Sequence, residues 1–202
     1  MKPRIYSDIR IRDGATVGEG GIPTLPVATF LFSVLHGVFR NNPGRFALGF
    51  PLMREGERRH PGHVFRVFAE SEEDWKIVYE ELDKHERIGS RIHLFREPLL
   101  IPENYSGPWI EYRRFRIPTR KSTQFRGEHK ERIPRSSQGI DLRQKRIDAS
   151  AEWPFFRLRS KTTGTIFSLH ITKRNGERTD ICCPDGYGLS GTTHSFSLPM
   201  GL

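Results

Sequence analysis

The chain is 202 residues long and carries 33 Lys+Arg against 24 Asp+Glu, a formal net charge of +9 at pH 7. This length suits one large domain or two small ones, and an aromatic content of 11% supplies enough apolar surface for a core, which excludes a fully disordered chain. No run of about 18 apolar residues occurs, which excludes a helix that spans a bilayer.

The beginning of the chain and its two cysteines bear on where the protein works. Met1–Tyr6 lacks the apolar stretch of a secretory signal peptide. Cys182 and Cys183 are adjacent, so they cannot form a disulfide framework, and they have no partners at the spacing of zinc ligands. We therefore expect a reduced, cytoplasmic setting and no membrane partner.

The positive charge is concentrated in one stretch. Residues 113–146 hold twelve basic and three acidic residues, so they contain the whole formal excess of +9, and the remaining acids and bases balance. A clustered field of this kind is typical of a protein that binds a polyanion. The alternatives are a solubilising or disordered basic segment and an anionic membrane surface, although the segment shows no amphipathic apolar face.

The first elements in chain order are a strand, a loop and a helix. Residues 5–12 alternate between apolar and polar and predict a half-buried strand. The glycine-rich loop at 14–22 lacks the Gly-Lys-Ser/Thr ending of a phosphate-binding loop. Residues 25–40 have helical spacing. The predicted apolar stripe of this helix comprises Val27, Phe30, Leu31, Val34, Leu35 and Val38.

Two strands, a helix and a further strand follow. Residues 46–50 and 63–68 read as strands, Ser71 is a candidate N-cap for a helix that runs to His85, and residues 92–95 form another strand. The order β-α-β-β-α-β is that of a ferredoxin-like, or split βαβ, fold. The sequence therefore predicts an α+β protein with a ferredoxin-like domain over residues 1–100, an architecture that RNA-binding domains often use.

Residues 101–202 form the second predicted domain, which contains the basic segment. Residues 109–117 read as a strand that leads into this segment, where we expect only short helices because prolines and glycines interrupt it. The interrupting residues are Pro118, Gly127, Pro134 and Gly139. Further strands are predicted at residues 155–160, 165–173 and 178–183, with a turn at Thr163–Gly164 between the first two.

Candidate chemistry lies outside the basic segment. His36 shares one side of the first helix with Phe32 and Arg40, where it either approaches a phosphate or is an ordinary boundary histidine. Residues 156–161 alternate, which places Arg157, Arg159 and Lys161 on one side of a strand and Ser160 on the other. This pattern fits either a strand that presents cations and a hydroxyl to a phosphodiester or an edge strand protected by charge.

Metal sites are weakly supported by the sequence. His60 and His63 have a two-residue spacer, but no cysteine or carboxylate pair accompanies them at ligand spacing. We therefore predict no metal and no cofactor.

Four segments in order resemble one family. These segments are Leu31–Gly37 followed by Leu48–Pro51, Tyr112–Arg116, Leu158–Ile171, and Tyr187–Ser190. In their order and spacing they resemble the CRISPR-associated endoribonuclease of type I-F systems, which cuts precursor CRISPR RNA at its repeat hairpin. The resemblance extends over nearly the whole chain.

The resemblance implies a ferredoxin-like domain, a smaller C-terminal RNA-binding lobe, and metal-independent cleavage at the 3′ base of the hairpin stem. The 2′-OH would attack its own 3′-phosphate, giving a 2′,3′-cyclic phosphate and a 5′-OH. The protein would stay on the 3′ hairpin of the mature guide RNA, beside other subunits of a surveillance complex. Its implied partners are therefore the CRISPR repeat hairpin and those subunits.

The resemblance also implies roles for individual residues. His36 would be the general base or acid, Ser160 would hold the nucleophilic 2′-OH, and Tyr187 would orient the histidine or the backbone. Phe167 would stack on the base pair that closes the stem, and Arg114 and Arg116 would read base edges near the foot of the stem. Further expected RNA contacts are Arg120, Lys121, Arg126, Lys130, Arg132 and Arg159.

The chain departs from the family pattern within its basic segment. Relatives often place a long arginine-rich helix in the major groove of the hairpin, whereas here prolines and glycines interrupt the segment. Arg116 stands where relatives often have a base-reading glutamine. Two other functions stay open: an RNA-hairpin-binding subunit without catalysis, and a basic DNA-binding factor, although the sequence has no helix-turn-helix or finger spacing.

Overall fold

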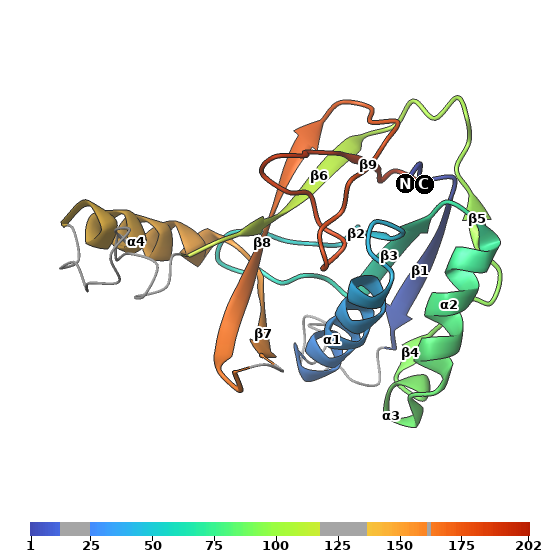
Figure 1. Cartoon of the computed structure of the whole chain (residues 1–202), viewed down its shortest axis with the longest axis horizontal. Coiled ribbons are helices and arrows are strands. Elements are labelled where there is room, and N and C mark those ends of the chain that lie inside the picture. Colours follow the sequence, from blue (N-terminus) through green and yellow to red (C-terminus); the bar gives the residue numbers. More distant parts are fainter. Residues whose placement is uncertain (13–24, 118–136, 161–162) are drawn as a thin grey trace, which may run out of the picture.

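The computed structural model describes residues 1–12, 25–117, 137–160 and 163–202 (Figure 1). In this part of the chain the fold is mixed α/β with two antiparallel sheets. The strands of the first sheet are β1 (Ile5–Ile11), β2 (Ala47–Gly49), β3 (Val64–Ala69), β4 (Ile92–His93) and β5 (Leu99–Leu100). Those of the second are β6 (Trp109–Phe115), β7 (Phe155–Arg159), β8 (Ile166–Gly176) and β9 (Leu198–Pro199). The α-helices are α1 (Leu25–Asn41), α2 (Glu72–Asp83), α3 (Glu86–Gly89) and α4 (Ser137–Ala149).

The first sheet has the strand order β2-β3-β1-β4, and β5 pairs with the same strand, β1, as β4 does. Every pairing in it is antiparallel. α1 and α2 contact each other, and Figure 1 draws both in front of the strands. α2 begins as predicted, because the Ser71 hydroxyl accepts the N–H of Asp74 at 3.3 Å.

α1 is buried on a different face from the one that its apolar stripe predicted. Leu31 and Leu35 lie in the core as expected, but Phe30 is 40% exposed. Phe32 and Phe39, outside the predicted stripe, are almost fully buried. The buried face of α1 therefore includes the side that carries Phe32 and His36, because the second sheet supplies aromatic partners for that side.

The second sheet has the order β7-β8-β6-β9 and shares one core with the first. The link between them is β7, which lies against α1 and inserts the fully buried Phe156 beside Phe32. β7 alternates as predicted, with Phe156 and Leu158 buried and Arg157 and Arg159 exposed. Its packing holds α1 against the second sheet.

Two expectations for the second half were wrong. The segment after Pro134 forms the 13-residue helix α4, although only short helices were expected. Gly139 is the third residue of the helix and so lies in its first turn, outside the interior in which the conformational freedom of glycine is most costly. Residues 178–183 are not a strand, because their hydrogen bonds go to separate segments: Thr179 accepts from Ser197, and Cys182 donates to Met1.

α4 extends away from the rest of the protein at the left of Figure 1. Its last turn is attached to the end of β6 through one arginine. The Arg146 guanidinium donates to the Arg116 carbonyl at 2.8 Å and lies 5.3 Å from the centre of the Phe115 ring. Among the described residues, no helix is long and apolar enough to cross a bilayer.

A buried ion pair ties the first sheet to the end of the chain. Arg66 on β3 is 4% exposed and donates two hydrogen bonds, of 2.7 and 3.0 Å, to Asp8 on β1. The same guanidinium donates to main-chain oxygens of Met200 and Leu202. Hydrogen bonds of a charged group are stronger than neutral ones. Those of Arg66 therefore hold β3 to β1 and to the last residues of the chain.

Replacing this arginine should destabilise the fold. We expect Arg66→Ala to lower the free energy of unfolding by about 3 kcal/mol, because it removes the buried hydrogen-bond donor of a half-buried carboxylate and of two main-chain oxygens. Arg10→Ala is the matched control. Arg10 contacts the same carboxylate at 3.7 Å but is 58% exposed, so its loss should cost less than about 1 kcal/mol. Equal losses in urea-induced unfolding would contradict the assignment.

Candidate functional site

His36 on α1 is held by a carbonyl from the other end of the chain. Its Nδ1 lies 2.5 Å from the carbonyl oxygen of Gly186. A carbonyl oxygen only accepts hydrogen bonds, so Nδ1 carries the proton of this bond. Nε2 is then the nitrogen that accepts a proton when the imidazole is neutral and donates one when the ring is an imidazolium.

A stack of parallel rings supports the imidazole. The Tyr187 ring lies 4.0 Å from the His36 ring at an interplanar angle of 11°, and it also stacks on Phe32 at 5.8 Å. Phe32 in turn stacks on Phe156 of β7 at 4.3 Å. His36 and Phe32 are four residues apart on α1 and so share one side of the helix, which lets one tyrosine cover both. The stack connects the half-exposed histidine with the core.

The loop that supplies both contacts is a tight turn. Within residues 185–189, the Asp185 carboxylate accepts the backbone N–H groups of Tyr187 and Leu189 at 2.8 and 3.1 Å. Gly188 has a φ of +76°, and its carbonyl accepts the N–H of Leu48 on β2 at 2.8 Å. The Tyr187–Ser190 segment is therefore fixed by the first sheet as well as by its own turn.

Arg114 contacts the group formed by His36, Tyr187 and the Gly186 carbonyl, which we call the His36 cluster, whereas its neighbour Arg113 does not. The Arg114 guanidinium lies 5.3 Å from the centre of the Tyr187 ring. Arg113 forms a 2.6 Å ion pair with Glu111, and the Ser190 hydroxyl donates to the same carboxylate at 2.6 Å. The charge of Arg113 is thus compensated by a carboxylate of the same strand.

Ser160 and Arg159 lie together where β7 turns into β8. The Ser160 hydroxyl accepts the N–H of Thr163 at 3.2 Å, and Arg159 donates to the Gly164 carbonyl at 3.2 Å. Gly164 has a φ of +67°, as the predicted turn requires. Phe167 pairs with Leu158 across the two strands and is half-buried against the core.

The remaining expected RNA contacts divide into described and undescribed positions. Arg116 follows β6, is exposed, and gives its carbonyl to Arg146. Of the basic residues on α4, Lys145 is exposed and Arg143 is half-buried. Five expected contacts lie in residues 118–136, outside the described part: Arg120, Lys121, Arg126, Lys130 and Arg132.

The His60 and His63 pair has a local structural explanation. His60 Nδ1 accepts the N–H of Gly62 at 3.0 Å. Burial, together with Arg54 and His63, lowers the pKa of His60. In the described residues, no three His, Cys, Asp or Glu side chains gather into a group that could hold a metal ion.

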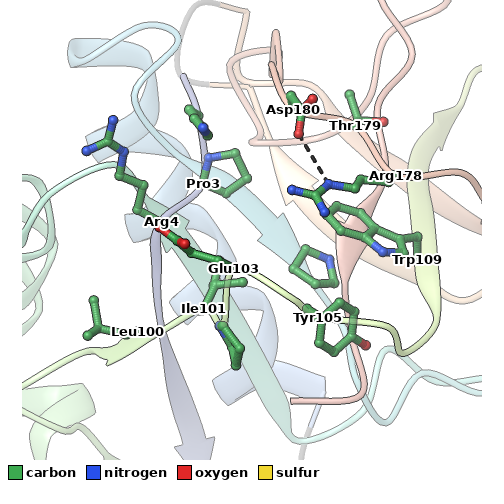
Figure 2. Close-up of a pocket in the computed structure, with 13 residues that line it drawn as sticks. Pro3, Arg4, Leu100, Ile101, Glu103, Tyr105, Trp109, Arg178, Thr179 and Asp180 are labelled. Carbon is green, nitrogen blue, oxygen red and sulfur yellow. Dashed lines mark hydrogen bonds and ion pairs between the residues drawn. The ribbon is translucent and has the colours of Figure 1, made fainter.

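A pocket of about 690 Å³ lies between the two chain ends and the start of β6 (Figure 2). Tyr105 and Trp109 form one wall, and Arg178 beside them is paired with Asp180 at 3.3 Å. No histidine lines this pocket, and none of the residues expected to act in catalysis does. This pocket is therefore separate from His36, Tyr187 and Ser160.

Sequence reasoning missed the groups that orient His36. The Gly186 carbonyl carries no sequence signal, because it is a main-chain atom. Asp185 did carry one, since an aspartate that precedes glycines is typical of a turn in which the carboxylate accepts backbone N–H groups. Glu111, which neutralises Arg113 and binds Ser190, could not be foreseen from spacing alone.

The two glycines of the turn should differ in their tolerance of a side chain. A Cβ at Gly188 would lie 2.8 Å from Phe39 Cε2 in a left-handed backbone conformation. A Cβ at Gly186 would meet only His36 Cε1, at 3.8 Å. We expect Gly188→Ala to lower the free energy of unfolding by about 1–3 kcal/mol and Gly186→Ala to change it by less than about 0.5 kcal/mol. Thermal unfolding of both variants checks this, and equal effects would contradict the described turn.

Comparison with known proteins identifies the family of this site. A family model described as CRISPR-associated protein (Cas_Csy4) matches residues 6–200, which include the whole His36 cluster and the β7–β8 turn. No curated protein is significantly similar to the chain. The match covers far more than half of the sequence and agrees with the four ordered segments. The chain therefore belongs to the CRISPR-associated Cas_Csy4 family, the type I-F endoribonucleases that process CRISPR repeat RNA.

Proposed function

We propose that this protein cleaves precursor CRISPR RNA at the 3′ base of the repeat hairpin without a metal ion and stays bound to the hairpin of the mature guide RNA. The observation that carries the proposal is the bond from His36 Nδ1 to the Gly186 carbonyl, which assigns the N–H of the neutral ring to Nδ1 and makes Nε2 its basic nitrogen. The reaction takes place in the cytoplasm, where the adjacent thiols of Cys182 and Cys183 stay reduced.

The reaction is a transesterification within the RNA. O2′ of the scissile nucleotide attacks the adjacent phosphorus, the P–O2′ bond forms and the P–O5′ bond breaks. The net proton movement is from O2′ to O5′, and the products are a 2′,3′-cyclic phosphate and a 5′-OH. His36 Nε2 accepts the first proton or donates the second, which is the general acid–base role that a positioned histidine performs.

Ser160 positions the nucleophile. Its oxygen already accepts the Thr163 N–H, and the hydrogen of the hydroxyl is a donor that this bond does not use. That hydrogen bonds an oxygen at the scissile nucleotide and helps to align O2′ with the P–O5′ bond. Alignment of this kind supplies much of the rate in an in-line displacement.

Tyr187 and Arg114 complete the site. The ring contact at 4.0 Å supports Tyr187 as the group that orients His36. The Arg114 guanidinium lies over the Tyr187 ring, which stacks on His36. In the proposed complex Arg114 is therefore near the scissile phosphate, where it can bond a guanine edge at the foot of the stem. Phe167 stacks on the closing base pair and so determines where the stem ends.

The main RNA-binding surface is proposed to be α4 and the basic residues around it. α4 projects from the body, which supports its insertion into the major groove at the open end of a short stem. Arg116 and Arg159 contact the foot of the stem. The basic residues between 120 and 132 contribute further phosphate contacts.

The architecture is proposed to be a ferredoxin-like domain over residues 1–100 and an RNA-binding lobe over residues 101–202. The strand order β2-β3-β1-β4 with antiparallel pairs and two helices supports the first assignment. The two parts share a core through Phe32 and Phe156, so they act as one unit on the RNA. Other subunits of a type I-F surveillance complex are the proposed protein partners.

Removal of the imidazole should abolish cutting but not binding. In single-turnover assays with a repeat-hairpin RNA in EDTA, we expect His36→Ala to slow cleavage by at least about 100-fold. The hairpin Kd should change by less than about threefold, because His36 lies outside the basic segment. His194→Ala, at an exposed histidine, is the control. Wild-type cleavage by His36→Ala would contradict the assignment, and tight binding without cleavage by the wild type would favour a non-catalytic binding subunit.

Contacts between α4 and RNA phosphates should be visible in the salt dependence of hairpin binding. We expect Lys145→Ala to weaken hairpin binding and to reduce the slope of log K against log salt by about 1, as loss of one phosphate contact does. Lys76→Ala on α2 removes a comparable exposed charge outside the proposed interface and should leave the slope unchanged. Equal slopes for both variants would exclude Lys145 from the RNA interface. Binding of duplex DNA as tight as that of the hairpin would favour a DNA-binding factor.

A further inference from the structure

Asp185 organises the turn that reaches His36. Its carboxylate oxygen Oδ1 accepts the N–H groups of Tyr187 and Leu189. Its backbone N–H donates to the Leu189 carbonyl at 2.9 Å, and its carbonyl accepts the Gly188 N–H at 2.9 Å. Four hydrogen bonds from one residue therefore fix the three residues that follow it and Leu189.

The residues inside this turn are those that contact the imidazole. Gly186 supplies the carbonyl at 2.5 Å from Nδ1, and Tyr187 supplies the ring at 4.0 Å. Gly186 and Gly188 have little conformational preference of their own, so these residues do not restrict the backbone dihedral angles between Asp185 and Leu189. The carboxylate is the side chain that restricts the backbone on both sides of Tyr187.

We propose that Asp185 is a positioning residue for His36. By fixing the 185–189 turn, its carboxylate keeps the Gly186 carbonyl on Nδ1 and the Tyr187 ring on the face of the imidazole. The imidazole is thereby held in the Nδ1–H tautomer, with Nε2 as its basic nitrogen. The tautomer follows from the geometry alone, while the effect on cleavage rests on the proposed function of His36.

The acceptor geometry of Asp185, and not its charge, is what this role requires. Both bonds that the carboxylate receives come from neutral N–H groups and end on the same oxygen. The amide oxygen of asparagine has two lone pairs and can accept both. Asp185→Asn should therefore restore what Asp185→Ala loses. Asp180→Ala is the matched control, because Asp180 lies five residues earlier, is exposed, and pairs with Arg178.

The first measurement reads the tautomer without any RNA. Long-range ¹H–¹⁵N NMR of the histidine ring distinguishes a protonated Nδ1 from a protonated Nε2. We expect the Nδ1–H form of neutral His36 in the wild type, in Asp185→Asn and in Asp180→Ala. Asp185→Ala should show the Nε2–H form or a mixture of both. An unchanged Nδ1–H form in folded Asp185→Ala would overturn the proposal, whatever the role of His36 in catalysis.

The second measurement is the single-turnover rate on a repeat-hairpin RNA. We expect Asp185→Ala to slow cleavage by about 10- to 100-fold, as a misplacement of a reacting group by about 1 Å does, with little change in the hairpin Kd. Asp185→Asn should cleave at close to the wild-type rate. If Asp185→Ala does not fold, Asp185→Asn still decides, because loss of the Nδ1–H form in that variant would overturn the proposal. A shifted tautomer with an unchanged cleavage rate would support the positioning role and contradict catalysis by His36.

Discussion

The stack of rings from Phe156 through Phe32 and Tyr187 to His36 is the interaction on which the candidate site depends. It begins in the core shared by the two sheets and ends at a half-exposed imidazole. Because its members come from α1, β7 and the C-terminal turn, the stack can form only when both halves of the chain have folded together. Parallel rings in contact also restrict rotation of the imidazole plane, which a single hydrogen bond does not. The packing of the core thus fixes the orientation of the His36 ring.

The basic segment is less uniform than its net charge suggests. Among its described residues, Arg113 is neutralised by Glu111, and Arg146 fastens α4 to β6. Arg114 lies against Tyr187 in the histidine cluster. Lys145 and Arg116 are exposed, so they are better placed to meet a phosphate backbone. Formal charge alone therefore does not separate the cations that bond within the protein, such as Arg113 and Arg146, from the exposed ones that we propose as RNA contacts.

Short-range patterns predicted the elements well, while partners distant in sequence determined what could not be predicted. The alternation in β7 and the Ser71 cap depend on local spacing, and both were confirmed. The buried face of α1 was misassigned because Phe32 is stabilised by Phe156, more than a hundred residues away. The helix at α4 was missed because Gly139 falls in its first turn, where its cost is small. The family resemblance correctly indicated a CRISPR-associated endoribonuclease, but spacing carried no sign of the Gly186 carbonyl that defines the tautomer of His36.

The central claim is that His36 assists attack by the RNA's own 2′-OH. The most direct test is single-turnover cleavage, in EDTA, of two repeat-hairpin RNAs that differ by one 2′-deoxy substitution at the scissile nucleotide. The account predicts that the unmodified RNA yields a 2′,3′-cyclic phosphate and a 5′-OH, and that the 2′-deoxy RNA binds with the same Kd but is not cut. Cleavage of the 2′-deoxy RNA at the same position would contradict the account.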